Sequence, residues 1–154
     1  MWKGMVVAIH IAANGGEAMN AVDQAKAIAG RGLSEDRYLK RTGTFCQNLG
    51  PSNELTFIES EAIEALKRDY GIELAPGESR RNITTSGVPL NHLVGREFRV
   101  GQARARGLRL CEPCSYLEKA TGKGVIAGLK HRGGLRAQII ADGEIRVGDA
   151  IQEA

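Results

Sequence analysis

The chain has 154 residues, of which 42% are hydrophobic and 25% are charged, and its formal net charge is +3. This length and composition predict one globular domain spanning 1–154, and no apolar run approaches the roughly 20 residues that cross a bilayer. Three cysteines are too few and too odd in number for a disulfide scaffold, and the first residues make a poor secretory leader. We therefore expect a cytoplasmic protein.

In chain order, the first expected element is a strand over 4–13, where β-branched residues alternate loosely. The segment 16–32 places apolar residues at helical spacing before a glycine, which predicts a capped helix. A short strand is expected around Cys46. The run 55–71 opens as a strand and continues as a helix that ends at Gly71.

The second half of the chain consists of short β-rich runs bounded by Gly, Asn or Asp, which predicts a curled sheet or a small barrel. Arg104, Arg106 and Arg109 surround a glycine that could host a bulge, so that alternate arginines point outward or into a groove. The segments 115–122 and 125–131 favour about one helical turn each.

Charge is unevenly distributed along the sequence. Residues 1–78 hold 8 basic and 11 acidic side chains, whereas residues 79–154 hold 13 basic and 7 acidic ones. The basic half favours an anionic ligand or partner, although solvated strand faces are the simpler explanation of the count.

Cys111 and Cys114 stand in the sequence CEPC, which leaves four interpretations open. A zinc site needs four Cys or His ligands, usually as two close pairs, and the other candidates here are isolated residues. A redox pair normally opens a long helix, whereas the segment after Cys114 supports barely two turns. Two buried small residues are the third interpretation. The fourth is a nucleophilic loop thiol near arginines, which is also a soft metal ligand.

Five blocks of the sequence resemble, in order, the MOSC domain family, named for the C-terminal domain of molybdenum cofactor sulfurase. The blocks are GLSEDRYLKRTG, LTFIESEAIEAL, ESRRNITTSGVPLNHLVGREFRVG, GLRLCEPCSYLEKATGKG and HRGGLRAQIIADGEIRVGDAI, and the match runs from about residue 5 to residue 151. The resemblance implies a stand-alone short member with a mainly β fold and a few helices. Its core would be a small closed or partly open barrel of mixed strands.

The resemblance also implies a cysteine that handles molybdenum cofactor sulfur or binds molybdenum directly, and Cys114 is the matching position. Cys111 matches no obligatory position and is expected to be a bystander. The cofactor, a molybdopterin, carries an anionic phosphate and a dithiolene, so it needs positive and hydrogen-bonding partners. The candidates for those partners are Arg81, Asn82, Thr84, Thr85, Arg37, Arg132, Gly133, Gly134 and Arg136.

Simpler roles compete at several of these positions. Arg37 could form an ion pair with Asp36, and the two threonines could cap a turn. For His131, which stands beside a lysine and an arginine, packing or solvent exposure is favoured over catalysis. The Gly133–Gly134 pair, in contrast, would let backbone amides approach a phosphate because no side chain intervenes.

The expected function is molybdenum cofactor binding, with Cys114 acting as a sulfur or cofactor carrier. An alternative is the catalytic unit of a molybdenum-dependent reductase of N-hydroxylated compounds, but the short chain favours the carrier. Neither an aminotransferase-like nor an electron-delivery domain is apparent. The expected partner is therefore a pyridoxal phosphate-linked sulfurase, an electron donor or a molybdoenzyme, and not a membrane. A basic nucleic-acid-binding module is supported only by the arginine excess.

Overall fold

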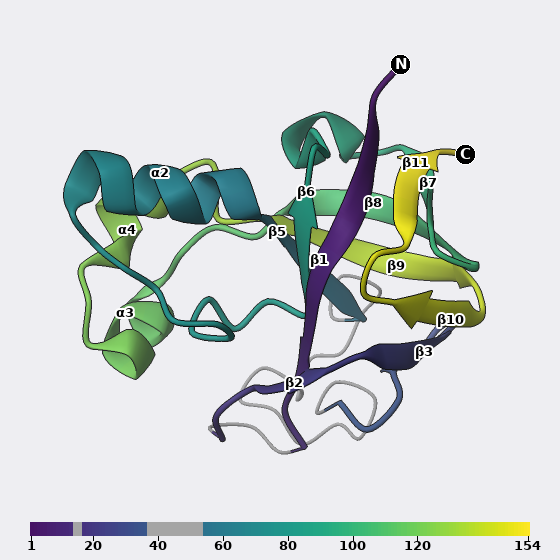
Figure 1. Ribbon diagram of the computed structural model, residues 1–154, viewed down its shortest axis with the longest axis horizontal. Coiled ribbons are helices and arrows are strands. Elements are labelled where there is room, and N and C mark those ends of the chain that lie inside the picture. The colour runs from purple at the N-terminus through teal and green to yellow at the C-terminus, as the bar shows by residue number, and fades with distance from the viewer. Residues whose placement is uncertain (14–16, 37–53) are drawn as a thin grey trace.

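A β-barrel with three α-helices gathered on one side makes up most of the described residues (Figure 1). The computed structural model describes residues 1–13, 17–36 and 54–154. The strands are β1 (Lys3–Ile11), β2 (Asn20–Val22), β3 (Gln24–Ile28), β4 (Gly32–Leu33), β5 (Leu55–Glu59), β6 (Ile83–Ser86), β7 (Glu97–Val100), β8 (Ala103–Leu110), β9 (Leu135–Ala141), β10 (Gly143–Arg146) and β11 (Ala150–Glu153). The helices are α2 (Ser60–Tyr70), α3 (Ser115–Thr121), α4 (Val125–Leu129) and the 3-10 helix η3 (Leu90–Leu93).

Seven of the described strands close the barrel. Their order around it is β1, β6, β5, β9, β8, β7 and β11, and β11 pairs with β1 to complete the ring. Only β5 and β6 run parallel among these neighbours, so the barrel is mixed. The prediction of a mainly β fold with a small barrel of mixed strands and a few helices is confirmed.

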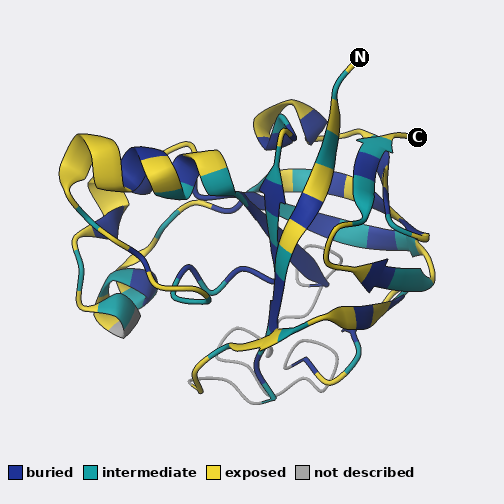
Figure 2. Ribbon diagram, viewed as in Figure 1, coloured by how far each residue is buried: buried dark blue, intermediate teal, exposed yellow. Residues whose placement is uncertain are grey.

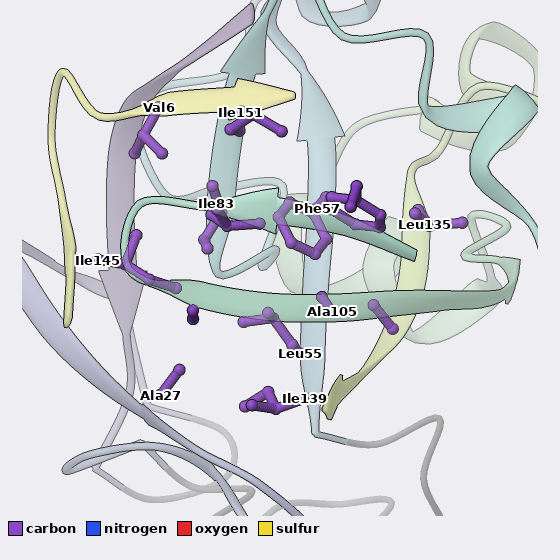
Figure 3. Close-up of a cluster of buried hydrophobic side chains, with 14 of the residues drawn as sticks. Val6, Ala27, Leu55, Phe57, Ile83, Ala105, Leu135, Ile139, Ile145 and Ile151 are labelled. Carbon is purple, nitrogen blue, oxygen red and sulfur yellow. The ribbon is translucent and has the colours of Figure 1, made fainter. Parts of the chain in front are cut away.

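Alternate side chains of the barrel strands fill its interior. Along β9, Leu135, Ala137 and Ile139 are buried, while the residues between them are partly exposed, as the period of two requires. Phe57 and Phe98 meet edge to face with ring centroids 5.5 Å apart. Figure 3 shows apolar side chains from many strands converging on the same space. The barrel interior is therefore a packed apolar core.

The run 55–71 forms the predicted strand and helix, β5 and α2. The helix ends at Gly71, whose φ of 67° lies in the left-handed region that glycine adopts without steric cost. Leu66 of α2 packs with Val125 and Leu129 of α4 in a second apolar cluster, and α2 presents both buried and exposed residues (Figure 2). The helices thus share a core of their own beside the barrel.

The predicted helix over 16–32 is wrong. The described residues of this segment form β2, β3, a turn and the first residue of β4. In β3, Ala25 and Ala27 are buried and the residues beside them are exposed or half-buried, and the strand pairs with both β10 and β4. Alanine favours helices in isolation, but pairing with a distant strand overrides this weak local preference.

The predictions for the arginine-rich strand and the two short helices are confirmed. The register between β8 and β9 shifts between Gly107 and Arg109, as expected for a bulge. A side chain at Gly107 would collide with the carbonyl oxygen of Leu93, which explains the glycine. The segments after Cys114 and Gly124 form α3 and α4. The predicted strand around Cys46 lies outside the described residues.

Helices long and apolar enough to cross a bilayer are absent from the part of the chain that the structure describes.

Candidate functional site around Cys114

The two cysteines of the CEPC segment occupy different environments. Cys111 follows β8 and is buried, with 2% of its surface exposed, whereas Cys114 is exposed. Cys114 immediately precedes α3, and its carbonyl oxygen accepts a hydrogen bond from the Glu118 amide at 3.1 Å. Helix α3 therefore fixes the backbone of Cys114 while its side chain stays accessible to solvent.

This difference separates the four interpretations of the cysteine pair. Burial gives Cys111 a packing role and leaves Cys114 as the accessible thiol of the pair, and the chemical role of each stays a prediction. Clusters of three or more His, Cys, Asp or Glu side chains that could hold a metal are absent from the described residues. The zinc interpretation therefore finds no ligand set there.

Arg81 holds the backbone from which the Cys114 loop begins. Its side chain is buried, and it donates hydrogen bonds to three carbonyl oxygens: from Nε to Gly133 at 2.8 Å, from Nη1 to Ser79 at 3.2 Å and from Nη2 to Cys111 at 3.0 Å. The Cys111 amide in turn donates to the Gly134 carbonyl oxygen at 2.8 Å. Arg81 therefore joins the start of the cysteine loop to the turn before β9.

The Gly133–Gly134 pair is required by close packing. A Cβ atom at Gly133 would lie 2.5 Å from the Cys111 carbonyl oxygen and 2.9 Å from Pro113 Cδ. Gly134 has φ 120°, and a Cβ atom there would collide with the Phe57 carbonyl oxygen. Both glycines are buried. In the described structure they bring the two loop backbones together, and their predicted approach to a phosphate stays a prediction.

Asn82 is fully buried and connects three strands. Its side-chain oxygen accepts hydrogen bonds from the Thr56 amide and hydroxyl at 3.2 and 3.0 Å, and its side-chain nitrogen donates to the His10 carbonyl oxygen at 3.2 Å. The His10 amide donates to the Asn82 carbonyl oxygen at 2.7 Å. These bonds connect the segment that contains Arg81 and Asn82 to Thr56 of β5 and to His10 of β1.

His10 itself is a buried polar group without a partner on one ring nitrogen. It is 4% exposed, and Nδ1 has no hydrogen-bond partner. Burial lowers the pKa of His10, so the neutral imidazole is favoured. A Cβ atom at Gly77 would lie 3.0 Å from the His10 ring, so the loop around Gly77 covers this histidine. From the sequence, His10 was only one of the isolated possible zinc ligands, because nothing in a strand pattern marks it as a buried group.

The remaining predicted cofactor ligands differ in their exposure and lie on different elements. Thr85 is buried and its hydroxyl donates to the Ile58 carbonyl oxygen at 3.5 Å, whereas Thr84 is half-buried. Arg136 lies on β9, directly opposite Arg109 of β8. Arg132 is exposed.

Arg132 stands near the end of β5. Burial raises the pKa of Glu59, and the positive charge of Arg132 partly offsets this effect. Arg37 lies outside the described residues. The structure thus brings Arg81, Gly133 and Gly134 to the base of the Cys114 loop and fixes Asn82 just beyond them. A cofactor-binding role for each stays a prediction.

Glu112 of the Cys114 loop contacts His131, a pair that the sequence analysis did not predict. Glu112 Oε2 is 2.9 Å from His131 Nδ1, and Glu112 Oε1 accepts a hydrogen bond from the His131 amide at 2.7 Å. The side chain of Asn91 donates to the His131 carbonyl oxygen at 2.6 Å. His131 has φ 64° and a side chain that is 71% exposed. The expectation of solvent exposure fits, and Glu112 holds the ring from the cysteine loop.

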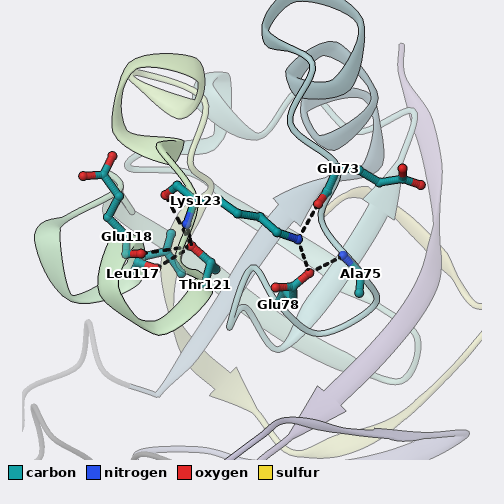
Figure 4. Close-up of polar contacts among 7 residues, drawn as sticks. All are labelled: Glu73, Ala75, Glu78, Leu117, Glu118, Thr121 and Lys123. Carbon is teal, nitrogen blue, oxygen red and sulfur yellow. Dashed lines mark hydrogen bonds and ion pairs between the residues drawn. The ribbon is translucent and has the colours of Figure 1, made fainter.

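The far end of α3 is attached to the loop that covers His10. Lys123 donates to the Glu73 carbonyl oxygen at 2.6 Å and to Glu78 Oε1 at 2.8 Å, and Glu78 Oε1 also accepts the Ala75 amide at 2.7 Å (Figure 4). A hollow of about 160 Å³ lies alongside, lined by Ala18, Met19, Pro76, Gly77, Glu78, Arg80 and Thr121. Helix α3 is thus fixed at its first turn by the bond between Cys114 and Glu118, and beyond its last residue by the contacts of Lys123.

The donor chemistry of these residues fits a molybdenum–dithiolene group. Cys114 offers a soft sulfur ligand that solvent can reach. Arg132 and Arg136 add positive charge on either side of the glycine pair, one exposed and one half-buried. Arg81, by contrast, directs three of its donors to carbonyl oxygens, so its described contacts are with the loop backbone.

Comparison with solved structures supports the fold. The chain is similar to the YuaD protein from Bacillus subtilis (TM-score 0.80, 15% identity, 98% of this chain and 97% of that chain covered). It is also similar to YiiM from Geobacillus stearothermophilus (TM-score 0.75, 14% identity, 98% and 75% covered). A third match is YiiM from Escherichia coli (TM-score 0.68, 20% identity, 100% and 70% covered). Among curated proteins no sequence matches.

A family model provides the classification that these distant structural likenesses leave open. The model of the MOSC domain matches residues 46–152. The matched region contains β5 to β10, most of β11 and the whole segment around Cys114. MOSC domains are associated with the molybdenum cofactor. The chain belongs to the MOSC domain family.

Proposed function

We propose that this MOSC domain binds the molybdenum cofactor and acts as a carrier of cofactor or of its sulfur through Cys114. The observation that carries the proposal is the difference between the two cysteines. Cys114 is exposed immediately before α3, whereas Cys111 is buried. A carrier needs a thiol that a partner can reach, and only the first of these two meets that requirement.

The chemistry of sulfur transfer is balanced without an external oxidant. The Cys114 thiolate attacks the terminal sulfur of a donor protein persulfide, a new S–S bond forms at Cys114, and the donor leaves as a thiolate. In cofactor binding, the same sulfur atom would be a ligand of molybdenum, and Arg132 and Arg136 would contact the anionic part of the pterin. When bound, the cofactor supplies a redox-active metal and a sulfur-accepting centre.

The residues around Cys114 have a positioning role in this proposal. Arg81 and the glycine pair hold the start of the loop, and Lys123 holds the end of α3. These contacts fix the Cys114 backbone before any ligand arrives, which reduces the ordering required on binding. The cytoplasmic location and the partner protein expected from the sequence are parts of the same proposal.

The test uses the whole chain with Cys114→Ala and the matched control Cys111→Ala. Protein made in a host that synthesises the cofactor is analysed for molybdenum. In parallel, protein incubated with a persulfide donor is mapped by peptide mass spectrometry for an added mass of about 32 Da. We expect Cys114→Ala to lose bound molybdenum and the added sulfur, and Cys111→Ala to keep both if it folds.

Retention of both signals in Cys114→Ala would refute the proposal. The reductase alternative is distinguished by one further measurement. Molybdenum-loaded protein would then reduce an N-hydroxylated amidine with a chemical electron donor through many turnovers, and the carrier would not.

A further inference from the structure

The outer surface of β7 and β8 is crowded with arginines. Arg99 of β7 and Arg104, Arg106 and Arg109 of β8 are all exposed, whereas the alternate residues between them, such as Phe98, are buried in the barrel. We call these four residues the arginine face. Strand alternation places Arg99, Arg104 and Arg106 on the outside of the barrel, and the bulge after Gly107 leaves Arg109 exposed as well.

Like charges lie directly opposite each other on this surface. Arg99 pairs with Arg104 in the register of β7 and β8. Side chains in such positions are close neighbours, and like charges there oppose folding. This arrangement is unfavourable in the isolated domain and becomes favourable when negative groups bind between the arginines.

The described carboxylates neutralise this charge only in part. Glu97 of β7 is 2.7 Å from Arg106 Nη2 and 3.9 Å from Arg104 Nη1, so one carboxylate is shared by two arginines. The cross-strand neighbours of Arg106 and Arg99 on the other side are the neutral Gln138 and Gln152.

Charges at the edge of this surface balance one another. Arg99 also borders a hollow of about 320 Å³. Its lining includes Glu144 and Asp149 together with Arg146. Asp149 already accepts the Arg146 amide at 2.8 Å.

We propose that the arginine face docks an acidic surface of the protein partner that exchanges sulfur or cofactor with Cys114. This inference rests on the proposed function. Strand β8 carries three of the four arginines and runs directly into Cys111 and the Cys114 loop, so a partner that covers its Arg109 end would adjoin that loop. Arginine suits this role because its planar fork binds carboxylates in two-point contacts.

An acidic protein fits this surface better than a nucleic acid does. Glu97 stands among the arginines, where it repels a continuous phosphate backbone but leaves room for separate carboxylates. The face is the outside of a barrel, and its described side chains are not aromatic, so stacking on bases has no platform there.

The test measures binding of a fluorescent peptide of alternating Glu and Asp by anisotropy, at low and high salt, beside a labelled DNA duplex. The variant is Arg99→Gln/Arg104→Gln/Arg109→Gln, which leaves the Arg106–Glu97 pair intact. The control is Arg31→Gln/Lys67→Gln/Arg68→Gln, which removes the same charge from exposed positions elsewhere.

We expect the face variant to weaken peptide binding by about tenfold and to flatten its salt dependence, and the control to change it by about twofold or less. The face variant should unfold at an equal or higher temperature, because the like charges of Arg99 and Arg104 are removed. An equal loss in both variants, or tighter binding of the duplex than of the peptide, would overturn the proposal. Cys114→Ala should bind the peptide normally, so failure of the carrier role and failure of this surface are separate results.

Discussion

The guanidinium group of Arg81 lies 3.0 Å, measured from Nη2, from the carbonyl oxygen of Cys111. This bond joins the segment just before β6 to the residue just after β8, from which the Cys114 loop departs. Since Nε of the same side chain binds Gly133, one arginine sets the spacing between the two segments that flank the candidate site.

Replacement of Arg81 is expected to destabilise the protein strongly. In Arg81→Ala the carbonyl oxygens of Ser79, Cys111 and Gly133 lose their donor while buried, which should lower the free energy of unfolding by about 3 kcal/mol or more. Arg81→Lys should recover only part of it, because an ammonium cannot reproduce the planar fork. Urea unfolding is the measurement, with exposed Arg109→Lys as the control. An unchanged midpoint in Arg81→Ala would contradict this role.

Gly134 of the same loop should tolerate a side chain less well than Gly122, which only ends helix α3. Gly134→Ala should prevent normal packing, because its Cβ would collide with the Phe57 carbonyl oxygen and its φ is 120°. Gly122→Ala meets nothing within 4 Å and carries only the cost of its left-handed φ, about 1 kcal/mol. Thermal unfolding of both variants tests this. Equal losses would show that the contact with Phe57 is relaxed.

The two cysteines should differ in reactivity in the folded protein. Iodoacetamide should label Cys114 rapidly at neutral pH and leave Cys111 unmodified until the protein is unfolded, because only the former is exposed. Peptide mass spectrometry identifies each site separately, with and without denaturant. Labelling of Cys111 at a similar rate under native conditions would mean that the loop opens readily.

His10 should make the protein acid-sensitive. Its pKa is lower in the folded state than in the unfolded chain, because burial disfavours the charged ring. The unfolded state therefore binds the proton more readily, so the contribution of His10 is constant above about pH 6.5 and turns against folding as the pH falls below that value. His10→Gln should lose less stability than the wild type between about pH 7.5 and pH 5.5. Urea midpoints measure this, and the exposed His92→Gln should behave like the wild type.

Sequence patterns predicted those elements correctly whose structure depends mainly on neighbouring residues. The strand and helix of 55–71 follow from apolar spacing and from a glycine that ends the helix, and the barrel follows from short β-rich runs bounded by turn residues. The segment 16–32 was mispredicted because alanines at helical spacing are also compatible with a strand. Only its partner β10, far along the chain, determines which is formed.

The candidate site shows a similar division. Cys114 was chosen through the family resemblance, and the structure shows that it is exposed. Arg81 was predicted to be a cofactor ligand, yet its described bonds reach carbonyl oxygens 30 and 52 positions away. The contact between Glu112 and His131 spans 19 positions and joins two loops. Contacts of this kind depend on how the barrel closes, which no short motif encodes.

Closure of the barrel joins the first strand to the last, because β1 pairs with both β6 and β11. A nascent chain on the ribosome cannot complete this ring until residues 150–153 have left the exit tunnel. Until then the free edges of β1 and β7 remain open to pairing with other chains. Slow emergence of β11 would therefore prolong the period in which the newly made protein is vulnerable to aggregation.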